Sequence, residues 1–175
     1  MAKLIMGIGL AGSGKTTTLV AFAERHGYKY VGIDDFRKKH AIGNGEASTR
    51  KAWDEMRSSV REHLERGETV VVESTFVNGP DRRKFLRFAR ECGATKIQGV
   101  FLNTPAELAW EQSVTRGRVV PEYIHKERTE MLAEHPPTIE DGFDALFTLD
   151  EFQKLTEAET LTGRKEFGRE KPRFS

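Results

Sequence analysis

The strongest constraint on this chain is a glycine-rich motif close to its start. Residues 9–16 read GLAGSGKT, which fits the pattern G-x-x-x-x-G-K-[S/T]. A short apolar run precedes the motif and a helical pattern follows it. Glycines let the backbone curl so that successive N–H groups point at phosphate oxygens, and the following helix dipole adds to their field. The motif therefore predicts a site for a nucleoside triphosphate.

The residue types within the motif predict individual roles. Lys15 is expected to reach the β and γ phosphates as a mobile charge, and the Thr16 hydroxyl is expected to bind Mg²⁺. We therefore predict ATP and Mg²⁺ as the cofactors. The expected nucleotide-binding residues of this segment are Gly9, Gly12, Ser13, Gly14, Lys15, Thr16 and Thr17.

Short apolar runs alternate with helical patterns along most of the chain. The predicted strands are 3–9, 28–33, 69–73, 96–102 and 143–149. The predicted helices are 16–25, 46–66 and 80–92, and another is expected to begin at Thr104, as an N-cap followed by Pro105. Such alternation implies right-handed βαβ crossovers. We expect an α/β P-loop NTPase fold, with a five-stranded parallel sheet and helices on both faces.

Length and composition limit the remaining possibilities. A chain of 175 residues suits one domain. We predict a kinase domain over 1–150 and a charged C-terminal tail over 151–175, because the apolar period fades from about Asp150. A mean hydropathy of −0.56 argues against a membrane protein. The single cysteine, Cys92, cannot form an internal disulfide, which favours the cytoplasm.

The formal net charge is +1, so the whole molecule does not attract nucleic acid. Binding of a polyanion would have to depend on local clusters of basic residues. Composition therefore leaves two acceptor classes open, a small anionic substrate and the end of a nucleic acid.

Acidic residues follow two of the predicted strands. Ligands gather at the carboxyl ends of parallel strands, so Asp34, Asp35 and Glu73 are expected beside the phosphate loop. We predict that Asp34 is the general base for an acceptor hydroxyl, with Arg37 one helical turn away as its partner or as a ligand of an acceptor phosphate. A helix N-cap is an equally open interpretation of Asp34. Glu73 is predicted near the Mg²⁺, with a strand-terminal acid facing water as the alternative.

Two groups of arginines are candidates for contacts with phosphates. Arg116 and Arg118 flank a glycine before a proline, which indicates a lid over about 116–135 that closes over ATP. An arginine that favours a helix C-terminus is the alternative for Arg116. Arg82 and Arg83 begin a predicted helix with a basic ridge, and they are predicted contacts of the substrate. A solvated helix face is the alternative for the later members of that ridge.

Four segments, GLAGSGKT, GIDDFRK, VVVESTFVNGPDRRKF and SVTRGRVVPEYI, together resemble the kinase domain of phage-type polynucleotide 5′-hydroxyl kinases over roughly residues 1–135. The resemblance implies transfer of the γ-phosphate of ATP to the 5′-hydroxyl of DNA or RNA. It implies that Lys15, Asp34, Arg37 and Arg116 are catalytic. Asp35, Arg82 and Arg83 are our predicted contacts of the substrate. The chain departs from the family pattern where a glycine is inserted at Gly79 and where the third strand ends in Glu73 rather than in an aspartate.

Three other functions share parts of this pattern. Zeta-toxin-like sugar-nucleotide kinases and other small-molecule kinases have a similar phosphate loop and a comparable acid–arginine segment. A kinase that acts on a modified base in DNA would use the same chemistry on another acceptor. An ATP-binding switch without transfer is a function from a different class, and the Asp34–Arg37 pair argues against it.

Overall fold

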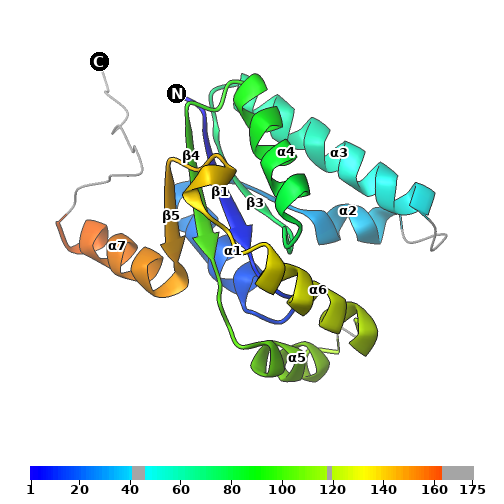
Figure 1. Ribbon diagram of the computed structural model, residues 1–175. Coiled ribbons are helices and arrows are strands. Elements are labelled where there is room, and N and C mark those ends of the chain that lie inside the picture. Colours follow the sequence, from blue (N-terminus) through cyan, green and yellow to red (C-terminus); the bar gives the residue numbers. More distant parts are fainter. Residues whose placement is uncertain (41–45, 118–119, 163–175) are drawn as a thin grey trace, which may run out of the picture.

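The computed structural model describes residues 1–40, 46–117 and 120–162 (Figure 1). Five strands form one sheet in the order β2-β3-β1-β4-β5, and every neighbouring pair is parallel. The strands are β1 (Lys3–Ile8), β2 (Lys29–Gly32), β3 (Thr69–Glu73), β4 (Lys96–Phe101) and β5 (Ala145–Thr148). The predicted five-stranded parallel sheet is confirmed, with ends that differ by one or two residues.

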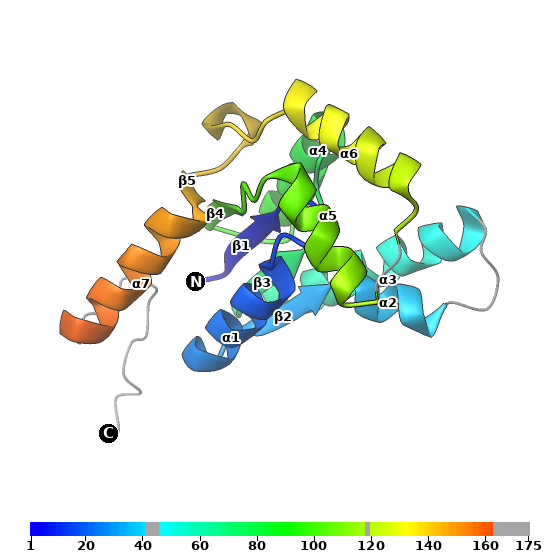
Figure 2. The same cartoon turned by 90° about the horizontal axis from the view of Figure 1, so that it is seen from below.

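Helices cover both faces of the sheet. The helices α1 (Lys15–His26) and α7 (Leu149–Thr162) pack on one face, and α3 (Glu46–Glu65) and α4 (Gly79–Glu91) pack on the other (Figures 1 and 2). Successive strand residues point to opposite faces. Ile5 and Val71 therefore join the core under α1, whereas Leu4 and Val70 join the core under α3 and α4.

The remaining helices lie beyond the carboxyl ends of the strands. The short helix α2 (Ile33–Lys39) follows β2 directly, and α5 (Ala106–Thr115) and α6 (Glu122–Glu134) lie over the same edge (Figure 2). A 3₁₀ turn, η1 (Ile139–Asp141), leads into β5. A small apolar cluster of Leu10, Val77 and Ala109, with Met131 and Leu132 against it, joins this edge to α5 and α6.

Two predictions about helices were wrong. Residues 151–162 belong to α7 rather than to a tail, because Phe152 is only 1% exposed and Leu149 and Leu155 pack beside it. Residues 163–175 lie outside the described part of the chain. Thr104 is not the cap of α5, which begins at Ala106 after Pro105. Its hydroxyl donates instead to the carbonyl of Ser13, at 3.0 Å, in the glycine-rich loop.

Within residues 1–40, 46–117 and 120–162, no helix combines the length and the apolar character that crossing a membrane requires.

Candidate active site

The glycine-rich loop connects β1 to α1 and has the shape of an anion cradle. Gly12 and Gly14 adopt φ angles of 82° and 90°, in the left-handed region that favours glycine. A Cβ on Gly12 would come within 2.0 Å of the Ala109 carbonyl oxygen, so α5 leaves no room for a side chain there. The Oγ of Ser13 is buried without a hydrogen-bond partner in the described residues.

The first turn of α1 suits phosphate groups. Its amides have no acceptor within the helix, and no acidic residue occupies the turn. Lys15 is buried, and its Nζ donates to the Leu10 carbonyl at 3.1 Å. The cradle and the lysine therefore fit the phosphates of a nucleotide.

Glu73 lies at the end of β3, next to this loop. The sheet register places it between Gly7 of β1 and Gly32 of β2. The Thr16 hydroxyl donates to its Oε2 at 3.0 Å, and its Oε1 lies 3.6 Å from the Nζ of Lys15. Glu73 is only 5% exposed, so it does not face bulk water. A hydroxyl and a carboxylate oxygen side by side are ligands that Mg²⁺ prefers, beside phosphate oxygens and water.

Tyr30 is a residue of this site that the sequence analysis missed. Its hydroxyl donates to Oε2 of Glu73. Burial and the neighbouring Glu73 carboxylate raise the pKa of Tyr30 above its ordinary value of 10.0, so the hydroxyl stays protonated as a donor. A Cβ on Gly32 would come within 2.6 Å of this hydroxyl, so the glycine makes room for the tyrosine ring. Side chains alternate along β2, so Tyr30 and Gly32 lie on the same face of the sheet. Only the pairing of β2 with β3 brings Tyr30 to Glu73.

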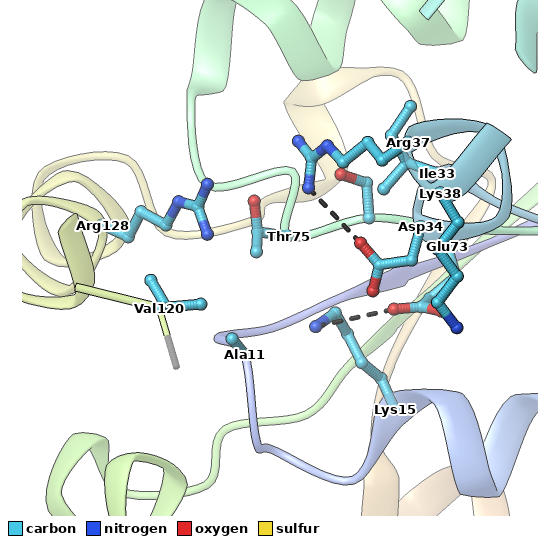
Figure 3. A pocket seen from close by; sticks show the side chains of 11 residues that line it. Ala11, Lys15, Ile33, Asp34, Arg37, Lys38, Glu73, Thr75, Val120 and Arg128 are labelled. Atoms are coloured by element: carbon cyan, nitrogen blue, oxygen red, sulfur yellow. Dashed lines mark hydrogen bonds and ion pairs between the residues drawn. The ribbon is translucent and has the colours of Figure 1, made fainter. Parts of the chain in front are cut away.

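Asp34 and Arg37 lie across the cavity from the phosphate loop. Asp34 is the second residue of α2, whose N-cap is Gly32, so the N-cap interpretation of Asp34 was wrong. The helix brings Arg37 Nη1 to 3.5 Å from Asp34 Oδ1. Both side chains are partly exposed, and both border the same cavity as Lys15 and Glu73 (Figure 3).

This cavity, which we call the transfer cavity, has a volume of about 300 Å³. Four elements and three loops contribute to it. Its lining residues are Ala11, Lys15, Ile33, Asp34, Arg37, Lys38, Glu73, Ser74, Thr75, Val120 and Arg128.

Arg128 is the second site residue that the sequence analysis missed. It belongs to α6, and its guanidinium points into the transfer cavity near Thr75 (Figure 3). Burial and the nearby Arg37 guanidinium lower the pKa of Arg128, whereas Asp34 opposes that shift. Arginine remains charged in proteins, so the cavity holds a fixed cation opposite Asp34. Arg128 lies outside the four motif segments of the sequence analysis. Only the placement of α6 brings it to the cavity.

The structure does not bring all predicted residues to the cavity. Asp35 is exposed on α2 and does not line it. Arg82 is fully buried, and the prediction that it contacts substrate was wrong. Its guanidinium donates to Asp141 at 2.8 Å and to the carbonyls of Phe76 and His135, which leaves it no surface for a ligand.

Arg83 and Arg116 have different surroundings. Arg83 is 42% exposed and donates to Asp141 at 3.3 Å. Arg116 caps α5 and borders a small hollow with Gly12, Gly14 and Thr16, beside the phosphate loop. Arg118 lies outside the described residues.

Comparisons with known proteins identify the family and the fold of the chain. Residues 4–136 match the family described as AAA domain, AAA_33. The chain belongs to this family. The match covers the glycine-rich loop, all the residues described around the transfer cavity, and both α5 and α6. No curated protein matches the chain.

Solved structures of kinases share the fold of this AAA_33 domain. A candidate kinase from Chloroflexus aurantiacus superposes with a TM-score of 0.70 at 14% identity, over 93% of this chain and 97% of that one. A chain of the Pnkp1/Rnl/Hen1 RNA repair complex gives 0.69 at 20% identity, over 77% of this chain and 45% of that one. Shikimate kinase from Acinetobacter baumannii gives 0.60 at 16% identity, over 95% and 96%. The protein therefore has a P-loop kinase fold.

Proposed function

We propose that this protein is an ATP-dependent kinase that transfers the γ-phosphate to the 5′-hydroxyl end of DNA or RNA. The observation that carries the proposal is the shared transfer cavity, where Lys15 and Glu73 on the nucleotide side meet Asp34 and Arg37 on the acceptor side. A switch that only binds nucleotide has no use for a carboxylate and an arginine aimed at an acceptor.

The proposed transfer uses these side chains in turn. Lys15 exchanges its contacts with Leu10 and Glu73 for the β and γ phosphates of ATP. Asp34, oriented by Arg37, accepts the proton of the acceptor hydroxyl as its oxygen bonds to the γ-phosphorus. The bond from that phosphorus to the bridging oxygen breaks, and ADP leaves. Arg128 and Arg116 stabilise negative charge on the transferred group.

Thr16 and Glu73 are the residues that would hold Mg²⁺. The ion would neutralise charge on the phosphate oxygens. Among the described residues, no cluster of three or more His, Cys, Asp or Glu could hold a metal by itself. The proposed Mg²⁺ would therefore depend on the nucleotide for part of its coordination.

Three features support a nucleic-acid end as the acceptor. The order and spacing of the four motifs resemble those of polynucleotide 5′-hydroxyl kinases, and one structural neighbour belongs to an RNA repair complex. A second cavity of about 300 Å³, which we call the aromatic cavity, adjoins the transfer cavity through Arg37, Ser74 and Thr75. Trp53 lines it together with Phe76 and Phe85, which are only 6% and 1% exposed. The half-buried Trp53 is therefore the side chain on which a base could stack.

A small-molecule kinase is the second candidate function. A cavity of about 300 Å³ has the size that a metabolite fills. Shikimate kinase also superposes over nearly the whole of both chains.

One experiment separates the two candidates. The protein is incubated with Mg²⁺ and ATP labelled in the γ-phosphate, in parallel with DNA and RNA oligonucleotides that have a 5′-hydroxyl and with a panel of metabolite alcohols. The same oligonucleotides with a 5′-phosphate are the control. We expect label on the 5′-hydroxyl oligonucleotides alone. Labelled metabolites with unlabelled oligonucleotides would favour the second candidate.

A further inference from the structure

A basic groove leads away from the acceptor side of the site. The helices α3 and α4 pack side by side (Figure 1). The groove lies between them and has a volume of about 590 Å³. The groove shares Arg57 with the aromatic cavity, which in turn shares Arg37 with the transfer cavity. The three hollows are therefore neighbours, in order from the phosphate loop to the α3–α4 surface.

Unpaired cations gather along this groove. Arg57 and Arg61 of α3 face Lys84 and Arg87 of α4. Within the described residues, none of the four forms an ion pair or a hydrogen bond, whereas Arg66, directly after α3, and Arg90 of α4 are both paired with carboxylates. Arg61 lies over the Phe88 ring, 5.3 Å from its centroid.

The charge balance of the groove is positive. Its remaining charged residues are Asp54 and Glu91, so four cations face two carboxylates in a molecule whose formal net charge is only +1. On each helix the two cations lie about one turn apart, which spaces them by roughly 5 Å along the groove. Two parallel rows of cations suit a chain of phosphates better than a single anion.

We propose that this α3–α4 groove binds the backbone phosphates of a single-stranded nucleic acid whose 5′ end lies in the transfer cavity. The inference rests on the proposed function and extends it from the reacting end to the nucleotides that follow. The half-buried Arg57 would contact the first of these phosphates, since it borders both the aromatic cavity and the groove. Arg61 and Arg87 would contact phosphates farther from the 5′ end.

The test is the double variant Arg61→Gln/Arg87→Gln, since both side chains are exposed and neither borders the transfer cavity. KM is measured for a 5′-hydroxyl dinucleotide and for a 12-mer oligonucleotide. We expect the KM for the 12-mer to rise about fivefold or more relative to the KM for the dinucleotide. We also expect the slope of log KM for the 12-mer against log salt concentration to fall by about 1.4, which is about 0.7 for each lost phosphate contact. The control is Arg25→Gln/Lys154→Gln, which changes the charge equally on α1 and α7 at the opposite face and leaves both values unchanged.

The outcomes distinguish this inference from the proposed function. If the protein phosphorylates oligonucleotides and the groove variant has the wild-type KM ratio and salt slope, the groove assignment is wrong and the kinase assignment stands. If the protein phosphorylates metabolites but no oligonucleotide, both are wrong. Polyglutamate can also be tested as a competitor of the 12-mer. If it competes as strongly as an oligonucleotide of equal charge, the groove would be assigned to an acidic protein segment instead.

Discussion

Asp34 is the residue on which the proposed transfer depends most directly. It borders the transfer cavity with Arg37 beside it, whereas the adjacent Asp35 is exposed and lies outside the cavity. Neighbouring aspartates in one helix thus have different surroundings. That difference provides a matched pair of variants for testing the role of the base.

We expect Asp34→Asn to keep ATP binding and to lower kcat by about 10² to 10⁴, because an amide cannot accept the proton of the acceptor hydroxyl. Steady-state kinetics and nucleotide titration measure the two effects. Asp35→Asn is the control and should retain wild-type kcat. Lys15→Ala should instead weaken ATP binding and transfer together. Unchanged turnover in Asp34→Asn would remove this residue from the mechanism.

Arg128 allows a separate test of charge stabilisation. We expect Arg128→Ala to lower kcat by about 10², as removal of one preorganised donor to developing charge does, with a smaller change in the KM for ATP. Lys126→Ala on the same helix is the control, since Lys126 is exposed and does not line the transfer cavity. Equal kcat values for the two variants would show that Arg128 does not act on the transferred group.

At the scale of elements, Arg82 joins segments that are distant in the sequence. Its side chain is 1% exposed, and its donors reach Asp141 of η1, the Phe76 carbonyl after β3 and the His135 carbonyl after α6. Phe76 has a φ of 46°, which is uncommon for a residue with a large side chain. The arginine therefore holds a strained loop beside the aromatic cavity.

We expect Arg82→Met to destabilise the protein by about 3–5 kcal/mol, because it leaves the Asp141 carboxylate buried without its main partner. Arg83→Met removes the more exposed partner of the same carboxylate and should cost less than about 1 kcal/mol. Urea unfolding measures both free energies. Similar losses in the two variants would contradict the assignment of Arg82 as the structural anchor.

At the scale of the whole molecule, local patterns predicted the layers and the phosphate loop. They also placed Asp34 one helical turn from Arg37. The errors concern long-range packing: Arg82 resembles a surface residue until Asp141, 59 positions away, is brought beside it. Tyr30 and Arg128 were missed because strand pairing and the placement of α6 bring them to the site. The apolar positions of α7 were present in the sequence, but its many charged residues obscured their spacing.

Acid stability of the whole fold depends in part on Asp144, which joins α4 to the β4–β5 edge. Partial burial by itself would raise the pKa of Asp144, but its bonds with the Ile97 amide, at 2.7 Å, and with Arg90 outweigh burial and lower the pKa below 3.8. A carboxyl group whose pKa is lower in the folded state stabilises that state at pH values above the pKa of the unfolded state. This contribution is lost as the pH falls through the pKa of the folded state.

We therefore expect the free energy of unfolding to fall below about pH 4, and to fall more in the wild type than in Asp144→Asn. The difference should be modest, because the Asp144 side chain is 44% exposed. Urea unfolding at several pH values between neutral and acidic measures this difference. Glu157→Gln, at an exposed position of α7, is the control. Parallel pH profiles for Asp144→Asn and the wild type would contradict the role of this carboxylate.

The bonds from Arg82 to the carbonyls of His135 and Pro136 fix one end of α6 to the body of the protein. A rotation of α6 would therefore pivot about that end, and a side chain would travel farther the more distant it is from the pivot. Arg128 lies seven residues before His135, about 10 Å along the axis, so a modest tilt would suffice to advance or withdraw its charge. The buried guanidinium of Arg82, which stabilises the fold, would thus also fix the point about which Arg128 moves.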